Sequence, residues 1–189
     1  MKPEILIAGI GNIFLGDDAF GVEVAQALRE RDIPEGVTVK DFGIRGFDLA
    51  YALLDPWDTV ILVDAMPRGG TPGTLYTIEP DLEAIGHPTV AAPTIDPHSM
   101  DPVRVLSLAA SMGEIRTCVL VVGCEPHDFG DELEGRMGLS EPVSAVVQEA
   151  CNMVLELVGR IIEQQAEKAE KQAEKAEKQA PKMCSVLSK

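Results

Sequence analysis

Two carboxylates, drawn from three aspartates, and one histidine could together bind a metal ion. Asp17 and Asp18 follow a glycine-rich turn, Asp64 ends the apolar run ILVD, and His98 lies in the proline-rich stretch DPHSMDP. Carboxylate oxygens and an imidazole nitrogen suit a borderline divalent ion such as zinc or nickel. Three protein ligands would leave coordination positions open for water or for a group of the substrate.

Each of these residues also has a simpler interpretation. Asp17 and Asp18 could cap the helix that follows them, because carboxylates favour a helix N-terminus. Asp64 could accept hydrogen bonds from loop amides, and His98 could be an ordinary loop histidine. Spacing alone does not choose between helix caps and a metal site.

Two other chemistries fit the same turn less well. Gly9 and Gly11 begin like a dinucleotide-binding fingerprint, but its third glycine would fall at Phe14, and two carboxylates just beyond the turn would repel a pyrophosphate. The sequence also contains no G-x-S-x-G element, the signature of one class of serine hydrolase.

Alternating strand and helix patterns position these residues. Continuous apolar runs predict buried parallel strands, and helical spacing of apolar residues predicts the helices between them. This order implies an α/β fold with a mainly parallel sheet and helices on both of its sides. Ligands bind beyond the carboxyl ends of such strands, where Asp17, Asp18 and Asp64 fall. Strands are predicted over 4–10, 37–43, 58–65 and 117–125, an edge strand over 74–80, and helices over 19–31, 47–54, 102–112 and from an N-cap at Ser140 through 162.

Charge and cysteine content narrow the class of protein. The chain has 189 residues and a formal charge of −15; residues 165–189 hold six lysines and four glutamates, so residues 1–164 carry −17. Such a body repels phosphate backbones, which argues against a nucleic-acid partner and favours a cation or a basic peptide. Reduced, mostly packed thiols are expected at Cys118, Cys124, Cys151 and Cys184. With no signal peptide or membrane segment evident, we expect a cytoplasmic protein.

The C-terminal stretch differs from the rest of the chain. AEKAEKQ occurs twice in succession, over 166–172 and 173–179, with alanines at three- and four-residue spacing. Glutamate–lysine pairs four residues apart favour a helix. We therefore expect one domain over 1–164 and a charged tail over 165–189 that is helical or disordered.

Six stretches, in order, resemble the hydrogenase maturation endopeptidases, which process the large subunit of nickel–iron hydrogenases. The resemblance runs from about residue 4 to residue 163 and implies a three-layer α/β/α sandwich with a twisted, mainly parallel sheet. The stretches are GIGNIFLGDDAFGVEVAQAL, VKDFGIRGFDLAYAL, VILVDAM, PGTLYTIEP, PHSMDPVRVL and VVGCEP with GLSEPV.

The resemblance also implies the metal ligands. The family binds metal through an acid of the first stretch, the aspartate of VDA and the histidine of PH, which match Asp18, Asp64 and His98. Family members often have glutamate where this chain has Asp18, so Asp17 is the alternative first ligand. Asp41 matches another acidic position, where its simpler role would be to stabilise a turn. Asp17, Asp18 or Asp41 could act as the catalytic base.

The resemblance implies that the protein is an endopeptidase, classed as aspartic-type. It would make a single cleavage that removes a C-terminal extension from the nickel-loaded large-subunit precursor. Nickel would be presented by that partner, with zinc or cadmium able to substitute in vitro, and the enzyme would be a monomer. The metal could polarise the scissile carbonyl or activate water. A non-catalytic nickel-binding accessory protein of the same assembly is the alternative.

Overall fold

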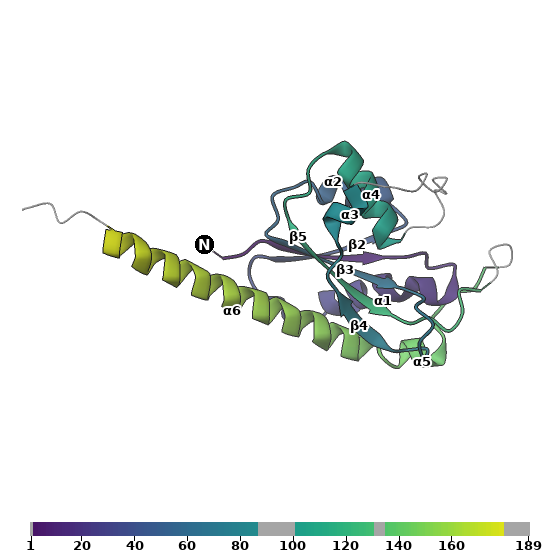
Figure 1. Ribbon diagram of the computed structural model, residues 1–189. Helices are drawn as coiled ribbons and strands as arrows, with labels where there is room; N and C mark the ends of the chain where they lie inside the picture. Colours follow the sequence, from purple (N-terminus) through teal and green to yellow (C-terminus); the bar gives the residue numbers. More distant parts are fainter. Residues whose placement is uncertain (1, 87–100, 131–134, 180–189) are drawn as a thin grey trace, which may run out of the picture.

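The chain folds into a five-stranded sheet between two layers of helices (Figure 1). The computed structural model describes residues 2–86, 101–130 and 135–179. The elements are β1 (Ile5–Ile10), the short 3-10 helix η1 (Gly16–Ala19), α1 (Phe20–Arg29), β2 (Val37–Gly43), α2 (Gly46–Ala52), β3 (Thr59–Ala65), β4 (Leu75–Ile78), α3 (Leu82–Gly86), α4 (Pro102–Met112), β5 (Cys118–Cys124), α5 (Glu141–Ser144) and α6 (Val147–Gln179).

The strand order is β2-β1-β3-β5-β4. The first four are parallel, and β4 pairs antiparallel with β5 at the edge. The predicted fold class is therefore confirmed, as is the prediction of an edge strand near residues 74–80. In this topology the carboxyl ends of β1 and β3 are neighbours, so the segments that follow them meet at one end of the sheet.

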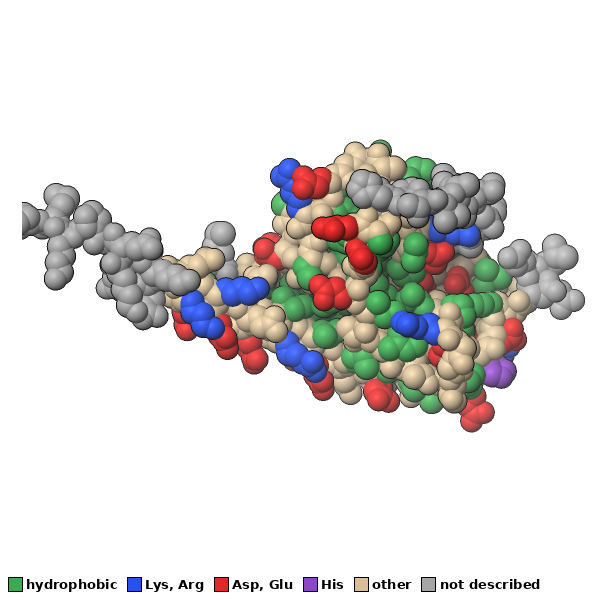
Figure 2. Space-filling view, in the orientation of Figure 1, with side chains coloured by type: hydrophobic (Ala, Val, Ile, Leu, Met, Phe, Trp, Pro, Cys, Tyr) green, Lys and Arg blue, Asp and Glu red, His purple; other side chains and the backbone are tan. Residues whose placement is uncertain are grey.

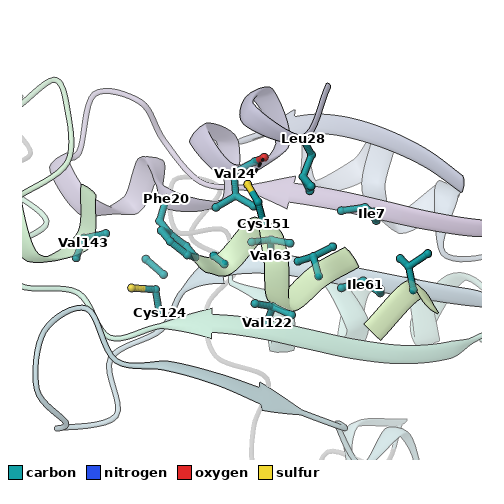
Figure 3. Packing of buried hydrophobic residues seen from close by; sticks show 14 of the residues in the cluster. Ile7, Phe20, Val24, Leu28, Ile61, Val63, Val122, Cys124, Val143 and Cys151 are labelled. Carbon is teal, nitrogen blue, oxygen red and sulfur yellow. Dashed lines mark hydrogen bonds between the residues drawn. The ribbon is translucent and has the colours of Figure 1, made fainter. Parts of the chain in front are cut away.

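The core consists of two apolar clusters, one on each face of the sheet. Strands β1 and β3 contribute alternate residues to the two clusters because successive strand side chains point to opposite faces. On one face Phe20 of α1 and Cys151 of α6 pack over Val63 and Val122 (Figure 3). Helices α2 and α4 cover the other face through residues such as Leu49 and Leu106.

The structure corrects two predictions about local detail. The single helix expected from Ser140 is divided into α5 and α6, and the Ser140 hydroxyl does not cap α5 but donates to Asp17 Oδ2. Cys118, at the start of β5, is exposed, whereas Cys124 and Cys151 are buried as expected. Cys184 lies outside the described residues.

Helix α6 is much longer than the sheet it covers. It packs on the core through Val154 and Val158 and then runs beyond the body of the molecule (Figure 1). Side chains along the projecting part are mainly charged (Figure 2). The helix continues without a break to Gln179, so the tail is helical at least that far. Within the described part of the chain, no helix is long and apolar enough to cross a membrane.

Candidate functional site

Glycines let the turn after β1 pack directly against the sheet. A Cβ at Gly21, in the first turn of α1, would lie 2.0 Å from Val63 O and 2.4 Å from Ile10 O. Gly11 has φ +130°, and a Cβ there would lie 1.7 Å from Asp18 O. These close approaches, rather than a phosphate cradle, explain the glycine pattern, and they bring η1 to the end of β3.

Asp18 is half-buried at the end of this turn. Its Oδ2 accepts a hydrogen bond of 2.6 Å from the backbone N–H of Asn12. Burial raises the pKa of the Asp18 carboxyl, and this hydrogen bond offsets only part of that effect.

Asp64 is the last but one residue of β3 and is 1 % exposed. Burial raises the pKa of Asp64 well above the ordinary value, and the negative charges of Asp18 and, more weakly, Asp101 raise it further. A hydrogen bond from Ala65 N–H lowers this pKa but does not outweigh those effects. Its Oδ1 has no hydrogen-bond partner among the described residues. A buried carboxylate with an unpaired oxygen beside like charges is costly without a cation.

Asp17 has a different environment, completely buried. Its Oδ1 accepts from Ser140 N at 2.6 Å, and its Oδ2 accepts from Ser140 Oγ at 2.8 Å, His127 N at 2.8 Å and Asp128 N at 3.0 Å. Burial alone would raise the pKa of Asp17, but these hydrogen bonds outweigh it and leave the pKa below its ordinary value. The expectation that Asp17 caps the next helix is wrong, because α1 has no side-chain cap.

Asp41 is not brought to the same face of the sheet as Asp64. Asp41 lies on the same face of β2 as Val37 and Val39, which pack against the apolar cluster beside α1. Asp64 lies on the same face of β3 as Leu62, which belongs to the apolar cluster on the other side of the sheet. The pleat therefore directs the two carboxylates toward opposite faces. His98, the expected third ligand, lies outside the described residues.

Two acidic residues that sequence reasoning passed over also lie at this end of the sheet. Asp101 is the N-cap of α4, accepting from Arg104 N at 2.9 Å, and its charge reaches Asp64. Glu125, directly after β5, is buried and accepts hydrogen bonds of 2.9–3.0 Å from the backbone N–H groups of Arg68 and Gly69. Glu125 thereby fixes the loop that follows Asp64. The sequence GCEP contains nothing that would predict hydrogen bonds to residues so distant in the chain.

The donor set of this site fits a divalent cation. Asp18 and Asp64 are close enough for one charge to raise the pKa of the other, and one oxygen of Asp64 has no hydrogen-bond partner within the described part of the chain. A cation between them would neutralise that repulsion and supply the missing partner. No cluster of three or more His, Cys, Asp or Glu side chains arranged to hold a metal occurs among residues 2–86, 101–130 and 135–172. A complete ligand set thus needs a further group.

Comparison with known proteins gives a consistent result. Residues 22–157 match the family model described as HycI, hydrogenase maturation protease. The chain is 33% identical over 154 residues to the hydrogenase 2 maturation protease of Escherichia coli K12, covering 80% of this chain and 88% of the relative.

Solved structures agree with the sequence relatives. The hydrogenase maturating endopeptidase HybD from E. coli superposes with a TM-score of 0.66 at 27% identity, over 83% of this chain and 93% of that one. The NiFe hydrogenase maturation protease HycI from Thermococcus kodakarensis gives 0.60 at 26% identity, over 84% and 94%.

Proposed function

The chain belongs to the hydrogenase maturation protease family, and from this membership we propose that it removes the C-terminal extension of a NiFe hydrogenase large-subunit precursor that already carries nickel. It is an endopeptidase, a hydrolase whose substrate is another protein. The proposed partner is that precursor alone, with no nucleic acid and no membrane insertion. The proposed compartment is the cytoplasm, in which Cys118, Cys124 and Cys151 would remain free thiols.

One observation carries this proposal: beside Asp18, at the carboxyl edge of the sheet, a buried oxygen of Asp64 has no hydrogen-bond partner among the described residues. We assign Asp18, Asp64 and His98 as the residues that contact the nickel of the substrate. An incomplete carboxylate site suits a metal that the partner brings with most of its own ligands. Zinc or cadmium would occupy the same oxygen and nitrogen ligands in vitro.

The residues divide into ligands, a structural tie and a base. Asp17 has no exposed surface and four hydrogen-bond donors around it, so we assign it the positioning of Asp18 rather than a proton transfer. We keep Asp41 as the candidate base of an aspartic-type reaction on the family resemblance alone; the pleat of β2 directs its carboxylate to the face opposite Asp64 and gives this assignment no support. Metal held between the two proteins would polarise the scissile carbonyl or lower the pKa of a bound water.

The test is incubation of the purified chain with a nickel-loaded large-subunit precursor, followed by intact-mass measurement. We expect a single mass loss equal to the C-terminal extension. Tight binding with no change in mass would instead indicate a non-catalytic accessory protein. The Asp41→Asn variant, assayed in parallel, should process the precursor far more slowly; full activity would exclude Asp41 as the base.

A further inference from the structure

Five of the seven large apolar side chains that are exposed in the described part of the chain lie on segments that follow β1 and β2 or on the stretch that pairs with them. These five form what we call the apolar collar, and they remain 40–73 % exposed; they are Ile13, Phe14, Ile44, Phe47 and Met137. Isolated exposed apolar residues are ordinary, but a group on neighbouring segments marks an interaction site.

Backbone hydrogen bonds bring the segments that carry the collar next to one another. Gly11 N donates to Gly43 O at 3.1 Å, which ties the loop holding Ile13 and Phe14 to the end of β2, next to Ile44. Arg136 N donates to Phe14 O at 2.7 Å, which places Met137 beside the same loop. Phe47 lies in the first turn of α2, directly after β2.

The collar is joined to the candidate metal site. The loop that carries Ile13 and Phe14 also supplies Asn12, whose N–H donates to Asp18 Oδ2. The surface therefore combines an apolar rim with an acidic centre formed by Asp18 and Asp64, whose charges act on one another. A rim of this kind excludes water when covered, which strengthens the attraction between the centre and a cation.

We propose that the apolar collar is the surface on which the precursor docks, with apolar residues of the partner around its metal seated against Ile13, Phe14, Ile44, Phe47 and Met137. This inference rests on the proposed function. Charge selects the occupant: a chain of formal charge −15 opposes a second copy of itself, whereas a partner that presents a divalent cation complements the acidic centre.

The test compares two aromatic residues on one helix. Phe47 and Tyr51 lie one turn apart on α2 and are 64 % and 62 % exposed; the collar as defined includes Phe47 and stops short of Tyr51. Initial rates of processing are measured against the concentration of nickel-loaded precursor for Phe47→Ser, Phe14→Ser, Met137→Ser and the control Tyr51→Ser. Since truncation of an interface anchor weakens binding by about tenfold, we expect KM to rise by about that factor in each collar variant, with kcat nearly unchanged.

The control Tyr51→Ser should have the KM of the wild type, and Phe47→Leu should restore most of the affinity. Unchanged KM in all three collar variants, with an active wild type, would overturn the docking surface while leaving the proposed function intact. An equal rise of KM in Tyr51→Ser would also overturn it. So would a dimer in sedimentation that the collar variants dissociate without any change in KM. Absence of processing by the wild type would instead refute the proposed function.

Discussion

At the scale of single residues, two adjacent aspartates have opposite electrostatic environments. Asp17 is surrounded by hydrogen-bond donors that lower its pKa, whereas Asp18 lies beside Asp64, and both of these carboxyls have raised pKa values. A carboxylate that is satisfied within the protein holds structure, and one that is not satisfied is available to a cation. This contrast underlies the different roles that we propose for the two residues.

The first prediction concerns the Asp64→Asn variant. Processing should be lost because a neutral amide is a poor metal ligand. Thermal stability should be equal to or higher than that of the wild type, because the substitution removes a buried negative charge beside Asp18. Thermal unfolding and precursor cleavage are measured on the same sample. An active variant, or an inactive one that is also unfolded, would contradict the assignment.

The second prediction concerns Asp17→Asn. An amide cannot accept all four hydrogen bonds at Asp17, so unfolding in urea at pH 7 should show a loss of roughly 2–4 kcal/mol. The matched Asp18→Asn variant, with one such hydrogen bond, should lose much less. Equal losses of unfolding free energy in the two variants would show that the hydrogen bonds of Asp17 do not stabilise the fold.

The lowered pKa of Asp17 also predicts how the stability of the fold depends on pH. Its folded pKa lies below the unfolded value near 3.8. The ionised carboxylate therefore stabilises the fold above that pH, and the stabilisation is lost as the pH falls through the folded pKa. Wild-type unfolding free energy should decline on acidification more steeply than that of Asp17→Asn. Parallel curves for the two proteins would argue against this contribution.

At the scale of elements, the site depends on how closely α1 approaches the sheet. In Gly21→Ala the new Cβ would meet two backbone oxygens at 2.0 and 2.4 Å, so α1 and η1 must move outward. We expect a loss of about 3 kcal/mol or more and slow processing, since backbone cannot repack as a side chain can.

The control for that change is Gly159→Ala in α6, where a Cβ would meet nothing within 4 Å. Alanine favours the helix, so this variant should gain roughly 0.5–1 kcal/mol. Urea unfolding measures both variants. Similar stabilities for the two alanine variants would mean that close packing at Gly21 is unimportant.

Elements dominated by local pattern were predictable from the sequence. The parallel strands are continuous apolar runs, and the fold class follows from their alternation with helices. The predicted bounds of the helix over 102–112 agree with those of α4 because proline, here Pro102, favours the first position of a helix. The break between α5 and α6 was missed because the apolar spacing continues across it. The role of Asp17 could not be read because its partners lie 110–123 residues later in the chain.

At the scale of the whole molecule, the projecting part of α6 lies away from the proposed reaction. The helix starts beside α5, near the carboxyl ends of the strands, and runs toward the opposite end of the sheet (Figure 1). Its last residues in the apolar cluster are Ile161 and Ile162. The part of α6 beyond Ile162 contributes no residue to the candidate metal site or to the apolar collar.

A truncated chain without residues 165–189 should therefore process the precursor within about twofold of the full rate, because substitutions and deletions outside packed contacts have small effects. Cleavage time courses of both chains provide the measurement. A large loss of rate in the truncated chain would indicate that the tail docks the partner.

The central claim is that cleavage requires a metal shared between the substrate and the Asp18–Asp64 pair. The most direct measurement is the intact mass of one precursor, prepared with and without nickel, after incubation with wild-type chain and with Asp64→Asn. The account predicts loss of the C-terminal extension only for nickel-loaded precursor with the wild type. Equal cleavage of the nickel-free precursor, or cleavage by Asp64→Asn, would contradict it.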